Sequence, residues 1–292
     1  MPEFEFATSE PILVSIGLDI GCAHISAGDG TSTTVDVRPS DTSSPCDLAT
    51  ARSARVSYAD GELVVAVAKA QGVPGDGAVV VDIKVPGGSR VNANALAADF
   101  HCRGQFGECR ITTGCGHILL DRTGPLYLNT VLGNVTVERV VGDVEAVAGS
   151  GDVSIREING AADINRSTGS TRIGEVTGDV RVFADSGDLH IGLAHAGVEA
   201  RAAQGDIRID ETVRGSLVLE TASGKLDVGI SHGTEATLHL DAHVGTVYRS
   251  LDLLDGADPA AETEESVEVH ARTIIGDIVV RRASLDHDAG WP

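Results

Sequence analysis

The stretch that decides the fold spans residues 151–210 and reads GDVSIREINGAADINRSTGSTRIGEVTGDVRVFADSGDLHIGLAHAGVEARAAQGDIRID. A turn residue, glycine in all cases but one, recurs every nine residues at 151, 160, 169, 178, 187, 196 and 205. The second and fourth residues after each turn residue are apolar, with Thr171 as the exception, and a polar residue usually separates them. This alternation predicts short strands, each with one buried face, joined by tight corners.

The same spacing runs from Gly116 to Gly224, and successive arms alternate in character. Arms that begin at 151 and 169 carry an apolar residue seven positions later, whereas the arm between them carries Ser167 there. The true repeat is therefore about 18 residues long and contains two unlike arms. A unit this short cannot bury its own apolar face, so such units must stack. We predict an all-β fold, a β-solenoid (parallel β-helix) of about 18-residue two-armed rungs. An antiparallel meander of nine-residue hairpin arms is the alternative that spacing alone leaves open.

The chain divides into five segments by composition and periodicity. Residues 1–100 are rich in strand-forming sequence but not periodic, and we interpret them as a β-rich N-terminal cap that covers one open end of the stack. The β-solenoid repeats follow over 101–247. We then expect an acidic loop over 248–266, terminal solenoid strands over 267–283 and a tail over 284–292.

Composition restricts the compartment and the partners. The formal net charge is −21 at pH 7, so nucleic acid and anionic membrane surfaces are both repelled. The N-terminus lacks a basic segment followed by a long apolar stretch, and no apolar run approaches the roughly 20 residues that span a bilayer. Five cysteines, an odd number at irregular spacing, do not suggest a secreted disulfide framework. We therefore expect a cytoplasmic protein.

Recurring Gly-Asp-Val, Gly-Asp-Ile and Gly-Asp-Leu arms carry a family resemblance. They stand at 142–144, 151–153, 178–180, 187–189, 205–207 and 276–278, and Val37-Arg38-Pro39-Ser40-Asp41 precedes them. Together they resemble a bacterial β-strand-repeat family named "putative adhesins", which is also a domain of unknown function. The resemblance covers almost the whole chain. It implies a β-helix fold and an adhesin-like role, and it brings no catalytic residues.

Two groups of residues offer candidate ligands for metal ions. Asp188 and Asp206 stand at Gly-Asp corners in adjacent rungs, where an aspartate usually accepts a hydrogen bond from the backbone two residues further on. Because the Gly-Gly-x-Gly-x-Asp repeat of calcium-binding β-rolls is absent, we predict structural rather than calcium-binding aspartates. A second group crowds into 17 residues and contains His101, Cys102, Cys109, Cys115 and His117. Its cysteine gaps of six and five residues do not match a zinc-binding Cys-x₂₋₄-Cys pair, so buried free cysteines are favoured and no metal site is predicted.

Outward positions form two ladders if the rungs stack. Asp163, Arg181 and Glu199 would form a compensated ion ladder. The other arm type carries a row that we call the basic stripe, which consists of Arg172, His190 and Arg208. Its positive charge would be uncompensated by neighbouring carboxylates, although the protein as a whole is strongly acidic. Such a stripe is either a solvated face or a docking site for an acidic partner.

The function most consistent with these features is a non-enzymatic β-solenoid scaffold or protein-binding, adhesin-like module. No catalytic motif and no cofactor-binding motif is present in the sequence. A self-assembling, bactofilin-like structural protein is the alternative, and a polysaccharide-active β-helix enzyme is disfavoured because nine-residue arms leave no room for cleft-forming loops. We expect a monomer or small oligomer with an unknown protein partner.

Overall fold

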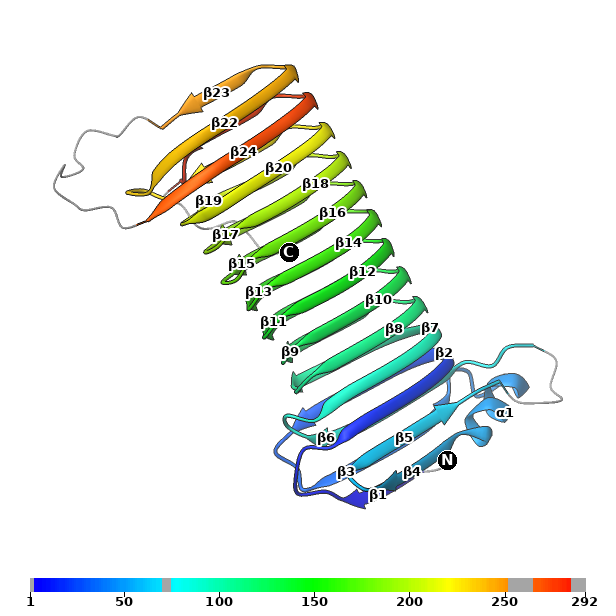
Figure 1. Ribbon diagram of the computed structural model, residues 1–292. Coiled ribbons are helices and arrows are strands. Elements are labelled where there is room, and N and C mark those ends of the chain that lie inside the picture. The colour runs from blue at the N-terminus through cyan, green and yellow to red at the C-terminus, as the bar shows by residue number, and fades with distance from the viewer. Residues whose placement is uncertain (1–2, 70–74, 252–264, 285–292) are drawn as a thin grey trace. The chain divides into compact units, whose positions relative to one another are not determined.

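The computed structural model describes residues 3–69, 75–251 and 265–284 (Figure 1). The fold is the predicted all-β solenoid, built mainly from parallel strands. Two compact units are described below, each by itself. Unit 1 comprises Met1–Val141 with Ala146–Ser150, and unit 2 comprises Gly142–Glu145 with Gly151–Pro292, so that β12 (Val144–Ser150) contributes to both. No helix within the described ranges has the length and hydropathy needed to cross a membrane.

Unit 2 contains two ladders of parallel strands, and successive strands along the chain alternate between them (Figure 1). The first ladder contains β13 (Val153–Asn159), β15 (Thr171–Val176), β17 (Leu189–Ala194), β19 (Ile207–Thr212), β21 (Leu226–Ile230), β25 (Ile278–Arg282) and β23 (Val247–Ser250). The second ladder contains β14 (Ala162–Thr168), β16 (Val180–Ser186), β18 (Val198–Gln204), β20 (Gly215–Ser223), β24 (Ser266–Ile275) and β22 (Glu235–Val244).

The register of the first ladder confirms the two-armed rung. Ile191 pairs with Ile173 on one side and with Ile209 on the other, an offset of 18 residues each time. All three isoleucines are completely buried, as the alternation of apolar and polar residues predicts. Consecutive strands belong to different ladders and paired strands are parallel, so the antiparallel meander is excluded.

The corners allow rungs to stack because their glycines let two backbones approach closely. Gly187 has φ of 120°, and a Cβ atom there would lie 1.6 Å from the carbonyl oxygen of Gly169. The aspartate that follows also joins the rungs. Asp188 Oδ1 accepts a hydrogen bond from the Asp206 amide at 2.9 Å, and Asp206 Oδ1 accepts one from the Lys225 amide at 2.7 Å. These carboxylates therefore bind the backbone of the next rung rather than the amide two residues on, because parallel stacking brings that amide within reach.

The polar exception in the apolar columns, Thr171, has a polar partner inside unit 2. Arg166 on β14 is only 7% exposed and donates a hydrogen bond from Nη1 to Thr171 Oγ1 at 2.6 Å. Ala184 and Ala202 occupy the corresponding position in the next two rungs, and such small side chains leave space beside the guanidinium. Burial lowers the pKa of Arg166. The sequence pattern did not predict a buried arginine.

The last strands of the chain do not form the last rung of unit 2. β24 lies between β20 and β22, and β25 lies between β21 and β23, so the rung of β22 and β23 stands beyond them. Strands were expected over 267–283, and they are found there in this penultimate position. Residues 252–264 of the expected acidic loop and 285–292 of the expected tail lie outside the described residues.

Unit 1 combines antiparallel pairs with parallel rungs. Among the described residues, antiparallel pairs join β1 (Glu3–Ala7) to β3 (Ser32–Pro39), β3 to β6 (Val79–Pro86), and β4 (Arg55–Ala59) to β5 (Glu62–Val67). Parallel pairs join β2 (Leu13–Gly28) to β5, to β6 and to β7 (Arg90–Gln105). The strand β7 also pairs in parallel with β8 (Cys109–Cys115) and β9 (Ile118–Thr123). The parallel ladders then continue from β8 to β10 (Leu126–Leu132) and from β9 to β11 (Val135–Val141). Parallel pairing therefore begins at β2, within the segment that was expected to form a non-periodic cap.

The helix α1 (Pro45–Ser53) was not expected from the sequence. Ser44 is its N-cap and accepts a hydrogen bond from the Asp47 amide at 3.3 Å, while Pro45 opens the first turn. An N-cap serine followed by proline and an acidic residue in the first turn is a recognised start signal for a helix. The strand-rich interpretation of residues 1–100 overlooked this signal.

Exchanging Ile173 for aspartate tests the inward and outward assignment. Ile173→Asp places an unpaired carboxylate between the buried Ile155 and Ile191, and we expect it to lower the free energy of unfolding by about 3–5 kcal/mol. The matched control is Arg172→Asp, one residue away on the exposed face, which should cost no more than about 0.5 kcal/mol. Urea denaturation followed by circular dichroism measures both. Equal losses would mean that the faces of β15 are assigned the wrong way round.

Candidate functional site

The basic stripe predicted from the sequence forms a row on the outward face of the first ladder. Arg172 on β15, His190 on β17 and Arg208 on β19 are register partners. Neighbouring strands of a sheet lie about 4.8 Å apart, so the three side chains leave the sheet one rung apart. Both arginines are exposed, and His190 is partly buried.

The expectation that this stripe is uncompensated is wrong. His190 Nε2 lies 2.6 Å from Asp210 Oδ2, and Arg208 Nε donates a hydrogen bond to Asp210 Oδ1 at 2.6 Å. Asp210 stands two residues after Arg208 on β19, and side chains two apart on a strand point to the same face. The nine-residue pattern singles out one outward residue per arm, so it gave no signal for this carboxylate.

Asp210 has room to lie between its partners because glycine occupies its position in the adjacent rungs. The corresponding residue is Gly192 in the preceding strand and Gly229 in the following one, as the 18- to 19-residue offset of the ladder gives. Neither glycine has a side chain that competes for space with the Asp210 carboxylate. The Asp210 side chain is 22% exposed, so its hydrogen bonds are partly shielded from water.

A second carboxylate extends the pairing to a strand that is distant in the sequence. Asp227 is the register partner of Arg208, and its side chain is only 14% exposed. Asp227 accepts hydrogen bonds from Lys225 Nζ at 2.9 Å and from Arg281 Nε at 3.0 Å. Arg281 Nη2 also lies 3.7 Å from Asp210 Oδ1. We call these residues, with His190 and Arg208, the charged network.

The charged network favours the ionised form of Asp210. Burial by itself raises the pKa of the Asp210 carboxyl, but the hydrogen bonds from His190 and Arg208, together with their charges, outweigh it. The pKa of Asp210 therefore lies below its ordinary value. Arg172, at the other end of the basic stripe, has no ion-pair partner among the described residues, so the stripe presents its uncompensated positive charge there.

The second ladder carries the compensated row that the sequence predicts. Asp163, Arg181 and Glu199 are register partners on β14, β16 and β18. Arg181 Nε lies 3.8 Å from Glu199 Oε2, and Arg201 lies 3.1 Å from Glu199 and 3.6 Å from Glu220. Positive and negative charges therefore alternate on this face, and each exposed pair contributes little net stability.

The cluster of cysteines and histidines between residues 101 and 117 does not converge on one point. Cys102 and Cys109 are buried, and burial raises the pKa of the Cys109 thiol to about 11. Cys115 is exposed. His117 Nδ1 accepts a hydrogen bond from the Asn134 amide at 3.2 Å. His101 instead lies beside His24, with ring centroids 5.1 Å apart. Spacing along the chain gave no signal for this contact because 77 residues separate the two histidines.

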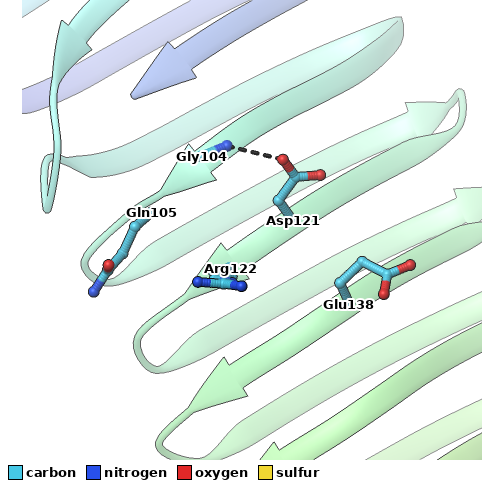
Figure 2. A pocket seen from close by; sticks show the side chains of 5 residues that line it. All are labelled: Gly104, Gln105, Asp121, Arg122 and Glu138. Carbon is cyan, nitrogen blue, oxygen red and sulfur yellow. Dashed lines mark hydrogen bonds between the residues drawn. The ribbon is translucent and has the colours of Figure 1, made fainter. Parts of the chain in front are cut away.

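Unit 1 also has a shallow depression of about 350 Å³, drawn in Figure 2. Its lining consists of Gly104, Gln105, Asp121, Arg122 and Glu138, and Asp121 Oδ2 accepts a hydrogen bond from the Gly104 amide at 2.9 Å. The five lining residues include two carboxylates, Asp121 and Glu138, but no histidine. Ligand pockets are usually enclosed, whereas this depression is open to solvent. Its open form suits a contact surface.

Stacked two-armed rungs with flat, charged outward faces define a β-solenoid repeat protein. The family model described as Toastrack DUF4097 matches residues 83–281, which is more than half of the chain. This protein belongs to that family, a domain family of unknown function, and the resemblance seen in the sequence is thereby confirmed.

Solved structures with a similar fold are described as putative adhesins. A "putative adhesin" from Parabacteroides merdae is 13% identical, with a TM-score of 0.50 over 78% of this chain and 95% of that chain. A "putative adhesin" from Bacteroides fragilis is 12% identical, with a TM-score of 0.34 over 96% of both chains. At such identities the first likeness shows the fold alone, and the second carries no argument. No curated protein matches this chain in sequence.

Asp210→Asn tests whether the charged network stabilises the fold. An aspartate carboxyl in an unfolded chain titrates near pH 3.9, and the Asp210 carboxyl titrates lower in the folded protein. The stabilisation is therefore present above about pH 4 and is lost as the pH falls through the folded pKa. We expect the unfolding free energy to fall more steeply below about pH 5 in the wild type than in Asp210→Asn, as measured by urea denaturation at a series of pH values. Parallel curves for the two proteins would show that Asp210 contributes nothing through its charge.

Proposed function

We propose that this protein is a non-enzymatic β-solenoid scaffold that binds a protein partner on the outward face of its first ladder. The observation that carries the proposal is the basic stripe, in which Arg172, His190 and Arg208 stand one rung apart on a hydrogen-bonded sheet. Such a face is rigid and flat, so it can hold an extended partner segment without rearranging first. The adhesin names of the structural neighbours support a binding role.

The chemistry of the stripe favours an acidic partner segment. The whole chain has a net charge of −21, so most of its surface repels acidic proteins. Arg172 is an exposed cation without an ion-pair partner among the described residues, and Arg208 is exposed two rungs away, at the far end of the stripe. A carboxylate that approaches Arg172 can form a bidentate contact with the guanidinium. Asp210 limits this attraction at both His190 and Arg208, so Arg172 is the proposed centre of the contact.

Two further features support binding rather than catalysis. Consecutive strands of the regular repeat between residues 151 and 230 follow each other through tight corners, such as the one at Gly187, and these corners leave no long loop there to enclose a substrate. The depression in Figure 2 is open to solvent and does not enclose a ligand. The reducing cytoplasm is the proposed compartment, and thiols rather than disulfides at Cys22, Cys102, Cys109 and Cys115 support it.

A photocrosslinking amino acid placed at Ser154 tests the partner site in living cells. Ser154 on β13 is the register partner of Arg172, so a crosslinker there reaches the proposed contact. We expect it to capture a protein through a peptide rich in aspartate and glutamate. Adding Arg172→Glu should reduce that capture about tenfold or more, which corresponds to about 1.4 kcal/mol.

The matched control places the same crosslinker at Asp163 on the second ladder, beside Arg181. That face is charge-compensated, so it should not capture the same peptide, and Arg181→Glu should leave the Ser154 capture unchanged. Identical captures from both positions, or a Ser154 capture that survives Arg172→Glu, would contradict the proposed site.

End-to-end self-assembly is a second candidate function, and the last rung of unit 2 favours it. Leu238 and Leu240 on β22 point toward the core but are only half-buried, whereas their partners Val269 and Ala271 on β24 are buried. A second copy stacked on this rung would continue the ladders and cover these leucines. The net charge of −21 opposes such stacking at low ionic strength, so we propose a monomer or small oligomer as the main state there.

Sedimentation velocity at low and high salt distinguishes a monomer or small oligomer from a stacked assembly. We expect the wild type to remain a monomer or small oligomer at low salt and to form larger species only when salt screens its charge. Leu240→Lys should remove the salt-induced species because it places a charge on the stacking surface. Wild-type filaments at low salt would favour assembly as the main function, and a wild type that never associates would exclude it.

A further inference from the structure

Three neighbouring strands of unit 1 bring metal-ligating side chains together on one outward face. Cys22 and His24 stand two residues apart on β2, so they point to the same side of the sheet. His101 on β7 is the register partner of His24, and Asp82 on β6 is its register partner on the other side. The four residues come from three segments that lie far apart in the sequence, so no short sequence motif contains them all.

The ligand atoms of three of these residues are already close together. Cys22 Sγ lies 3.4 Å from His24 Nε2, and one ligand atom from each of Cys22, His24 and His101 can be chosen so that all lie within 4.8 Å of one another. Zinc–sulfur and zinc–nitrogen distances of about 2.3 and 2.0–2.1 Å place tetrahedral ligand atoms roughly 3.3–3.8 Å apart. Small side-chain rotations are therefore sufficient to close the site. All three residues are partly buried, which limits competition from bulk water.

A carboxylate on the neighbouring strand β6 fixes the orientation of the His24 ring. Its Nδ1 lies 3.0 Å from Asp82 Oδ1, so its Nε2 faces the Cys22 thiol. Asp82 is held in turn by a hydrogen bond from Arg38. A carboxylate that accepts from the far nitrogen of a histidine is the usual support of a metal-ligating imidazole.

His101 completes the set from the neighbouring strand β7. Its ring centroid lies 5.1 Å from that of His24, and one of its ring nitrogens lies within 4.8 Å of a ligand atom of both Cys22 and His24. By contrast, the residues of a second group of this kind in unit 2, His239, Glu268 and His270, are all exposed. The partly buried group in unit 1 is therefore the stronger candidate.

We propose that Cys22, His24 and His101 form a Zn²⁺ site, with Asp82 as the residue that positions His24. One thiolate and two imidazoles suit this borderline-soft cation, and a fourth position stays open to water. The ion would connect β2 with β7 across the ladder, so its binding would stabilise unit 1. This inference concerns residues for which the sequence predicted no metal role, and it does not depend on the proposed partner site.

Cobalt titration of the full chain tests the site. After treatment with a chelator, Co²⁺ is added as an optical probe, because a cobalt–thiolate bond gives a charge-transfer band in the near ultraviolet and a tetrahedral site gives strong visible bands. We expect one Co²⁺ per chain, displacement by Zn²⁺ and a higher melting temperature with Zn²⁺. Cys22→Ser should abolish the charge-transfer band and weaken binding by at least about a hundredfold.

Further variants separate ligands from their surroundings. His101→Gln should weaken binding as Cys22→Ser does, and it provides a second ligand variant if one of them fails to fold by circular dichroism. Asp82→Asn should keep the band but weaken binding about 10- to 100-fold, as expected for a positioning residue. Cys115→Ser, which removes an exposed thiol of unit 1, and His270→Ala should leave the titration unchanged. A charge-transfer band that persists in Cys22→Ser, or the absence of saturable binding, would overturn the proposal.

Discussion

Hydrogen bonding between parallel strands holds residues 18 apart side by side, and the remaining features of unit 2 depend on this register. Ile173, Ile191 and Ile209 form one continuous apolar column because each rung repeats the same position. Burial of each such side chain contributes about 1.5–3 kcal/mol, which replaces the aromatic core that this sequence lacks. The register also requires close approach at the corners, where glycine at 187 and the Asp188 carboxylate connect consecutive rungs.

The same constraint limits the chemistry that the protein can perform. A corner at which a Cβ atom would collide with the preceding rung admits no bulky side chain, and it leads directly into the next strand. The faces of the solenoid are therefore flat, and functional side chains act in rows rather than in a deep cleft. Rows of regularly spaced charges suit recognition of an extended partner, which agrees with the binding role that we propose.

Rows also allow residues from distant parts of the chain to meet. In unit 2, Arg281 reaches Asp227 and Asp210 because β25 inserts beside β21. In unit 1, β2 lies between β6 and β7, so Cys22 and His24 meet His101 and Asp82. Both groups combine a partly buried carboxylate with hydrogen-bond donors that keep its pKa below the ordinary value. Such prearranged clusters are where a flat solenoid can acquire specific chemistry.

The sequence by itself determined the face of each residue in the regular arms, because period-two alternation and glycine corners are local signals. It determined that Ile191 is buried and that Arg172, His190 and Arg208 share a row. It predicted the solenoid and its 18-residue register, but only the structure excluded the antiparallel meander. Only the tertiary structure decided that Asp210 compensates part of that row, that Arg166 is buried against Thr171, and that β24 and β25 precede the final rung in space. Only the tertiary structure brought Cys22 and His24 close to His101. The helix α1 did have a local sequence signal, but the interpretation of residues 1–100 as strands missed it. The physical reason is that local alternation fixes which way a side chain points, whereas the partners that it meets depend on which strands stack beside it, and that choice is made by packing over the whole unit.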